Sequence, residues 1–251
     1  MQTREDILTG RSAFLTGSGG EKHAAENRRD LTMAIQQNYP AFEMLRDKLL
    51  GAGGPKNVAQ PERVLDAASA AETELLFDHL RQHDLLKLDQ GEVTLNKIDA
   101  RRFLTGGWLE ELAWLAAMEA GAHEAHYSQL VGWDVEGYTG ENEIDVIFRR
   151  DDKLGFVSCK ALRSSLQSSD RKHRARMMDA VHEADNLADH FGQPGERVGV
   201  LVTTDLFDEE RGEARYQALM GKAAVLDVRV IPLEDIRWDK LVGVMEYLMD
   251  H

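Results

Sequence analysis

The sequence predicts an α/β protein whose mixed sheet carries helices on both faces. Two observations support this fold class. From about residue 100 onward, strand patterns alternate with helical patterns in the order αβββαβαβα. A short charged turn, residues 149–153, joins the second of these strands to the third. A hairpin followed by helix-linked strands gives a sheet that is partly antiparallel and partly parallel.

The composition restricts the class of protein. The 251 residues include 30 Lys and Arg against 44 Asp and Glu, so the formal net charge is −14. This balance argues against coating nucleic acid through bulk charge, but it leaves room for a local basic groove. The sequence shows neither a signal-peptide pattern nor the ~20 apolar residues of a membrane helix. Because Cys159 is the single cysteine, an internal disulfide is excluded, and we expect a cytoplasmic protein without membrane contact.

Residues 1–58 are predicted to form a helical arm and a linker. Residues 1–30 show no sustained apolar period, which indicates a loose arm. Apolar residues recur at helical spacing over 31–50 around Pro40, so either two short helices or one broken helix is expected. The arm also contains glycines that lack the spacing of a phosphate-binding loop, namely Gly17, Gly19 and Gly20.

Residues 59–99 are predicted to form a small winged-helix-like connector. Helical patterns at 61–68 and 71–83 precede strand patterns at 85–88 and 92–95, which indicate a hairpin. Helix, helix and hairpin are the outline of a winged helix. The second helix carries acidic residues at positions where a DNA-recognition helix needs Lys or Arg. This favours a packing or dimerisation role. These acids are Glu72, Glu74 and Asp78.

Residues 100–251 are predicted to form the main α/β domain. We expect helices at 107–121, 170–191, 208–220 and 233–249. We expect strands near 127–131, 143–148, 155–161, 198–203 and 225–231.

Charged residues interrupt two of the predicted strands. Because side chains alternate along a strand, Glu143 and Asp145 are expected on one face, opposite Ile144 and Val146. On the neighbouring strand, Ser158 and Lys160 are likewise expected to share a face, with Val157 and Cys159 opposite. A salt bridge between Asp145 and Lys160 is the purely structural interpretation. The first turn of the preceding helix adds Glu110 and Glu111, where acids also suit the helix dipole.

Three segments together resemble a known family. They are Gly106–Glu111, Asn142–Val146 and Phe156–Lys160. In this order they are similar to the PD-(D/E)xK restriction-endonuclease-like nucleases, and more narrowly to the nuclease domain of CRISPR ancillary nucleases with a CARF sensor domain for cyclic oligoadenylate. The resemblance covers about residues 100–235. It implies a restriction-endonuclease-like αβββαβ core, a homodimer and a role in antiviral defence.

The resemblance implies a nuclease that hydrolyses phosphodiester bonds of DNA, RNA or both with Mg²⁺ or Mn²⁺. Asp145 would be the principal metal ligand and Glu110 the second carboxylate, with Glu111 in reserve because sequence does not fix which side of the helix turns inward. The backbone carbonyl of Cys159 would be a further ligand. Lys160 would orient the attacking water or stabilise the charge on the phosphate.

The sequence departs from the family pattern in two ways. Ser158 stands where the superfamily has Glu or Asp; Ser158 would hold a metal-bound water, and Glu143 would supplement the missing carboxylate. A CARF domain is not recognisable, so we expect any sensing of cyclic oligoadenylate only through a domain not present in this chain. A restriction-type DNase without a second messenger is the corresponding alternative.

A basic stretch follows the candidate lysine. We interpret it as a loop and the first turn of a helix that bind the nucleic-acid backbone. The alternative interpretation is a helix start whose charges face only solvent. Its residues are Arg163, Arg171, Lys172, Arg174 and Arg176. For the whole chain, a catalytically inactive winged-helix nucleic-acid-binding or scaffold protein is the alternative to a nuclease.

Overall fold

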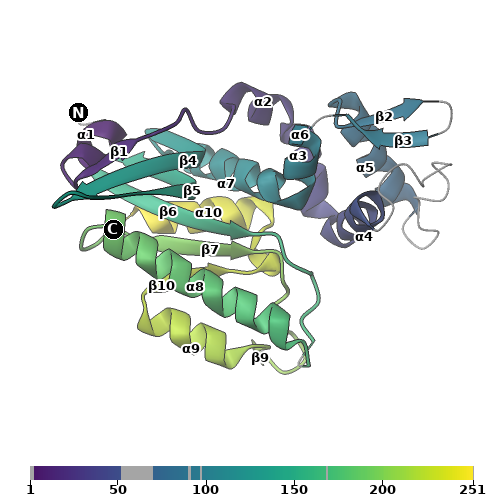
Figure 1. Ribbon diagram of the computed structural model, residues 1–251. Coiled ribbons are helices and arrows are strands. Elements are labelled where there is room, and N and C mark those ends of the chain that lie inside the picture. The colour runs from purple at the N-terminus through teal and green to yellow at the C-terminus, as the bar shows by residue number, and fades with distance from the viewer. Residues whose placement is uncertain (1–2, 52–69, 90–91, 97, 168, 251) are drawn as a thin grey trace. The chain divides into compact units, whose positions relative to one another are not determined.

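The computed structural model describes residues 3–51, 70–89, 92–96, 98–167 and 169–250 (Figure 1). The chain divides into two compact units. The sheet unit consists of residues 1–23 and 110–251, and the helical unit consists of residues 24–109. The domain boundary predicted between residues 58 and 59 lies outside the described residues, so the predicted division into three domains stays a prediction.

The sheet unit is built on a mixed sheet with the strand order β1-β4-β5-β6-β7-β10 (Figure 1). Neighbouring strands from β1 to β6 are antiparallel, whereas β6, β7 and β10 are parallel. This arrangement confirms the predicted mixed sheet. The strands are β1 (Ala13–Leu15), β4 (Glu124–Val135), β5 (Tyr138–Arg150), β6 (Lys153–Lys160), β7 (Val198–Val202) and β10 (Val228–Ile231).

Helices cover both faces of this sheet (Figure 1). On one face, α8 (Arg171–Phe191) and α9 (Gln217–Val225) pack over a buried cluster that contains Met177, Phe156 and Leu219. On the other face lie α10 (Trp238–Met249) and the part of α7 (Trp108–Glu119) that begins at Glu110. Every helix in the described ranges is too short or too polar to span a bilayer.

The N-terminal segment is ordered, which corrects the prediction of a loose arm. Helix α1 (Arg4–Thr9) begins at a capping box made by Thr3 and Asp6. The next strand, β1, pairs with β4, and its Ala13 lies opposite Trp133. Apolar periodicity could not reveal this order, because elements as short as α1 and β1 do not show a repeat.

The glycine group of this arm lies against β4. The N–H of Gly20 donates a hydrogen bond of 2.7 Å to the carbonyl of Tyr127. A Cβ atom on Gly20 would lie 2.1 Å from the Tyr127 ring. These glycines therefore permit a close approach of two backbones.

We expect Gly20→Ala to lower the free energy of unfolding by about 1–3 kcal/mol, because the added methyl group forces the Tyr127 ring to move. Urea unfolding followed by fluorescence measures this change. Gly221→Ala is the matched control: it lies within α9 and an added Cβ meets nothing within 4 Å, so stability should stay equal or rise. Equal stability of both variants would contradict the close approach.

Two predicted C-terminal helices are shorter than expected. Residues predicted to be helical at 208–220 instead form a small hairpin, β8 (Phe207–Asp208) and β9 (Glu213–Ala214), before α9. Gly212 closes this hairpin with a φ of 67°, in the left-handed region that favours glycine. The segment predicted to be one helix at 233–249 is a 3₁₀ turn, η5 (Leu233–Asp235), followed by α10.

Within the described residues, α2 (Lys22–Asn27) leads into the helical unit, whose hairpin is preceded by α3 (Arg29–Gln37), α4 (Tyr39–Leu50) and α5 (Ala70–Gln82). After them follow the hairpin strands β2 (Leu86–Asp89) and β3 (Glu92–Leu95), helix α6 (Ile98–Arg102) and the π-helical turn η4 (Phe103–Gly107). Pro40 lies in the first turn of α4 and separates it from α3, which confirms the interpretation as two short helices. Trp108 is fully buried and stacks on Tyr39 with ring centroids 5.5 Å apart.

The predicted winged-helix-like connector lies partly within the described residues. Its second helix and its hairpin are observed as α5 and the β2–β3 pair. The first predicted helix, residues 61–68, lies outside the described residues. The winged-helix outline therefore stays a prediction.

Candidate active site

Asp145 lies where β4 and β5 depart from regular strand geometry. Ile144 and Ile147 belong to the same buried cluster beneath α8, although residues three apart in a regular strand point to opposite faces. Ser128, which lies opposite Asp145 in the β4–β5 register, has a φ of 49°. This left-handed conformation is rare for serine. The regular alternation from which we expected Glu143 and Asp145 to share a face is therefore interrupted at this point.

The Asp145 carboxylate is held by the neighbouring strand β6. Its Oδ2 atom accepts a hydrogen bond of 2.6 Å from the N–H of Cys159 and one of 3.2 Å from the Ser158 hydroxyl. Burial raises the pKa of Asp145 above its ordinary value, and the charge of Glu143 adds to this effect. The two hydrogen bonds and the charge of Lys160 oppose the rise but do not cancel it.

Lys160 lies at the end of β6 and forms an ion pair with α8. Its Nζ atom is 2.7 Å from a carboxylate oxygen of Glu183. Burial disfavours the ammonium, but the hydrogen bond to Glu183 and the charge of Asp145 outweigh it and raise the pKa of Lys160. Lys160 is therefore positively charged at neutral pH. Its close ion pair is made with Glu183, whereas Asp145 acts on it through space.

Glu110 and Glu111 lie in the first turn of α7 in different surroundings. Glu110 accepts a hydrogen bond from the hydroxyl of Ser128, the residue opposite Asp145. Glu111 is buried, with 3% of its surface exposed. The contact with Ser128 places Glu110 beside the strand position that carries Asp145.

The pKa of the Cys159 thiol is affected by burial and by three charged side chains. Burial raises the pKa of Cys159 well above its ordinary value, and the charges of Asp145 and Glu110 raise it further. The charge of Lys160 acts in the opposite direction. Three charged groups from α7, β5 and β6 therefore lie within electrostatic reach of one side chain. These are three of the groups that the sequence singled out, and their roles in a metal site stay a prediction.

Sequence reasoning missed two residues of this neighbourhood. Ser128 links α7 to β4, and the only signal for it is a pair of polar residues, Ser128 and Gln129, inside a predicted strand. Glu183 lacks a local signal, because its partner Lys160 is on another element and the pair forms only when α8 packs on the sheet.

The basic residues beyond Lys160 do not share one environment. Four of them are exposed, namely Arg163, Arg171, Lys172 and Arg176. The guanidinium of Arg174 lies over the Tyr216 ring, 4.3 Å from its centroid, and is only partly exposed. This cation–π contact gives Arg174 a structural role.

The loop that carries Arg163 is hydrogen-bonded to the two residues that follow β7. The Thr203 hydroxyl donates a hydrogen bond of 2.7 Å to the carbonyl of Leu162 and accepts one of 2.7 Å from its N–H. The Thr204 hydroxyl donates a bond of 2.8 Å to the carbonyl of Arg163. These bonds hold the backbone at the start of the basic stretch.

We expect Glu183→Gln to lower the pKa of the Lys160 ammonium. Glu183 helps to raise the pKa of Lys160, so its removal lets the ammonium lose its proton earlier as pH rises. An NMR titration of the Lys160 side chain measures this shift. Asp189→Asn, an exposed acid near the other end of α8, should leave the titration profile unchanged. Identical titration profiles for wild type and Glu183→Gln would contradict this role of the ion pair.

Comparison with known proteins relates this α/β sheet and its charged site to endonucleases. A model of the family described as "Card1-like, endonuclease domain" matches residues 97–194. This range contains Glu110, Asp145 and Lys160, together with all of α8. The part of the chain that carries the charged site is therefore similar to an endonuclease domain.

Two solved structures share the fold. Protein VC1899 from Vibrio cholerae has a TM-score of 0.67 and 17% sequence identity, and the match covers 97% of this chain and 60% of that one. Can2 from Sulfobacillus thermosulfidooxidans, in complex with cyclic tetra-adenylate, has a TM-score of 0.61 and 15% identity, with coverage of 97% and 61%. The chain thus spans about three-fifths of the length of both proteins. A search of curated proteins finds no match.

Proposed function

We propose that this chain is a divalent-metal-dependent nuclease that hydrolyses phosphodiester bonds of DNA, RNA or both. One observation carries the proposal: Glu110 accepts a hydrogen bond from Ser128, which lies across from Asp145 on β4, and the N–H of Cys159, the residue before Lys160, donates to Asp145. Two carboxylates and an ammonium in one place are the groups that phosphodiester hydrolysis requires. The match of residues 97–194 to an endonuclease domain supports the same reaction.

The donor atoms fit Mg²⁺ or Mn²⁺. Both ions prefer oxygen ligands, and Asp145 and Glu110 supply carboxylates while Cys159 supplies a backbone carbonyl. Burial raises the pKa of the Asp145 carboxyl because it disfavours the negative charge, and a bound cation would stabilise that charge. When bound, such an ion would polarise the phosphate and lower the pKa of a water molecule.

The protein side chains would perform the remaining tasks. Lys160 is held as an ammonium by Glu183 and would stabilise the negative charge that grows on the phosphate. Ser158 donates a hydrogen bond to Asp145 and so limits the rotation of that carboxylate. Glu143 is exposed and acts electrostatically on Asp145, so it would supplement the carboxylate that Ser158 replaces.

The exposed basic residues would bind the nucleic-acid backbone. Arg163, Arg171, Lys172 and Arg176 follow Lys160 in the sequence and are exposed. Cations that neutralise phosphates release counterions, so the affinity should fall as the salt concentration rises. Arg174 would contribute less, because its guanidinium already contacts Tyr216.

The biological setting belongs to the same proposal. The match to the Card1-like endonuclease domain and the similarity in fold to Can2 support a nuclease of CRISPR-linked antiviral defence. The further proposal that it acts in the cytoplasm as a homodimer rests on the composition and on the motif resemblance alone.

The experiment that tests the proposed reaction is a cleavage assay on four labelled substrates: single-stranded and double-stranded DNA and RNA. The protein is incubated with each substrate in Mn²⁺ and in EDTA. We expect cleavage of at least one substrate in Mn²⁺ and none in EDTA. Binding of nucleic acid without cleavage under any condition would contradict the proposal and favour a catalytically inactive binding protein.

A further inference from the structure

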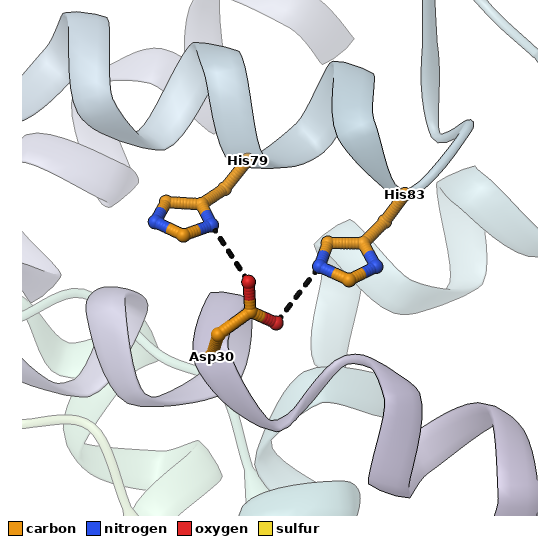
Figure 2. Close-up of side chains that lie close together, drawn as sticks. All are labelled: Asp30, His79 and His83. Atoms are coloured by element: carbon orange, nitrogen blue, oxygen red, sulfur yellow. Dashed lines mark hydrogen bonds and ion pairs between the residues drawn. The ribbon is translucent and has the colours of Figure 1, made fainter.

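A second cluster of metal-binding side chains lies in the helical unit, apart from the residues of the proposed nuclease site. His79 of α5 and His83, which directly follows that helix, both turn toward Asp30 of α3 (Figure 2). Nδ1 of His79 is 3.2 Å from one carboxylate oxygen of Asp30, and Nε2 of His83 is 2.8 Å from the other. The two histidines are four residues apart, a spacing that places them on one face of a helix.

The three donor atoms are as close together as the ligands of one metal ion. One atom from each residue can be chosen so that all three lie within 4.8 Å of one another. In a tetrahedral zinc site with bonds of ~2.0–2.1 Å, neighbouring ligand atoms lie roughly 3.3 Å apart. The two short distances to Asp30 fall around this value, so binding would require only small side-chain movements.

The histidine side chains are partly withdrawn from water. His79 and His83 are 19% and 17% exposed, whereas Asp30 is 52% exposed. Nδ1 of His79 is buried, and among the described residues it has no partner with hydrogen-bond geometry. A buried nitrogen without a hydrogen bond costs free energy. A metal ion would use its lone pair, and the exposed side of Asp30 would leave room for water.

We propose that Asp30, His79 and His83 bind one Zn²⁺ ion that joins α3 to α5. Two imidazoles and one carboxylate suit zinc and similar transition ions, whereas the oxygen ligands at Asp145 suit Mg²⁺ or Mn²⁺. Three protein ligands leave a fourth position for water. Since α3 and α5 are separate segments of the chain, the ion stabilises the folded helical unit by binding it in preference to the unfolded chain.

The test measures zinc binding to the full chain after treatment with EDTA. Zn²⁺ is titrated in competition with a chromophoric chelator, using the Asp145→Asn variant so that the proposed nuclease site contributes less. We expect one tight equivalent of zinc in this variant and a loss of affinity of at least about 10–100-fold when His83→Gln or His79→Gln is added. Glutamine keeps a polar side chain at each position but is a poor zinc ligand.

His123→Gln is the matched control, because His123 also pairs with an aspartate, Asp151 at 3.8 Å, but without a second histidine. It should retain the tight equivalent of zinc. Bound Co²⁺ should give the visible absorption bands of a low-coordinate site in the parent and in His123→Gln, but not in His83→Gln. Circular dichroism establishes that each variant is folded. Absence of a tight equivalent, or equal affinity in all variants, would overturn the proposal.

Discussion

The Asp145→Asn variant is expected to cleave nucleic acid about 10³-fold more slowly than the wild type, the upper end of the loss seen when one charge-stabilising group is removed. Asparagine has nearly the same shape and can still accept the hydrogen bond from the N–H of Cys159. What it loses is the negative charge that would hold a divalent cation. The initial rate of cleavage in Mn²⁺, under single-turnover conditions, measures the effect.

A measurement of the free energy of unfolding distinguishes a loss of catalysis in Asp145→Asn from a loss of folded protein. The folded state raises the pKa of Asp145, so ionisation of this carboxyl lowers the free energy of unfolding. This stability is lost as pH rises from the pKa of Asp145 in the unfolded chain to its higher pKa in the folded protein. At neutral pH, asparagine removes a buried charge, so the free energy of unfolding should stay equal or increase. Asp152→Asn, at an exposed turn position, is the control for both measurements. A slow but destabilised Asp145→Asn variant would point to a structural role instead.

The Lys160→Met variant is expected to cleave about 10²-fold more slowly. Methionine keeps most of the apolar stem but removes the ammonium that lies near Asp145 and is paired with Glu183. If Lys160 stabilises charge on the phosphate, the loss should appear in the chemical step. Single-turnover cleavage at saturating protein separates that step from binding.

Lys153→Met is the matched control for this substitution. Lys153 lies at the opposite end of the same strand, β6, and is exposed. Its replacement should leave the single-turnover rate unchanged. Equal rates for Lys160→Met and the wild type would exclude Lys160 from the reaction, even if cleavage itself is observed.

The long elements of the sheet unit could be predicted from the sequence because each has its own periodic signal. Helix α8 begins at the Asp170 cap and ends before Gly192, as expected, and β7 is an apolar run. The shortest elements, β1, β8 and β9, could not be predicted. The β8 strand is held by a distant residue, since Glu234 accepts hydrogen bonds from the N–H groups of Leu206 and Phe207. Local propensity does not contain such information.

In the candidate site, too, local features could be predicted from the sequence, whereas long-range contacts could not. The contact between Asp145 and Ser158 follows from the antiparallel pairing of β5 with β6, which a short charged turn predicts. The direction of Asp145 does not follow, because alternation breaks where Ser128 adopts a left-handed conformation. The pairing of Lys160 with Glu183 depends on how α8 packs, and it was equally inaccessible from local sequence.

The most direct test of the central claim is Mn²⁺ binding to four proteins, measured by electron paramagnetic resonance. These are the His83→Gln parent, which suppresses the proposed zinc site, and the same chain carrying Glu110→Gln, Asp145→Asn or Lys160→Met. We predict that the parent and the lysine variant bind Mn²⁺, whereas either carboxylate variant binds at least about 10-fold more weakly. Equal Mn²⁺ affinity in all four proteins would contradict a metal site formed by Glu110 and Asp145.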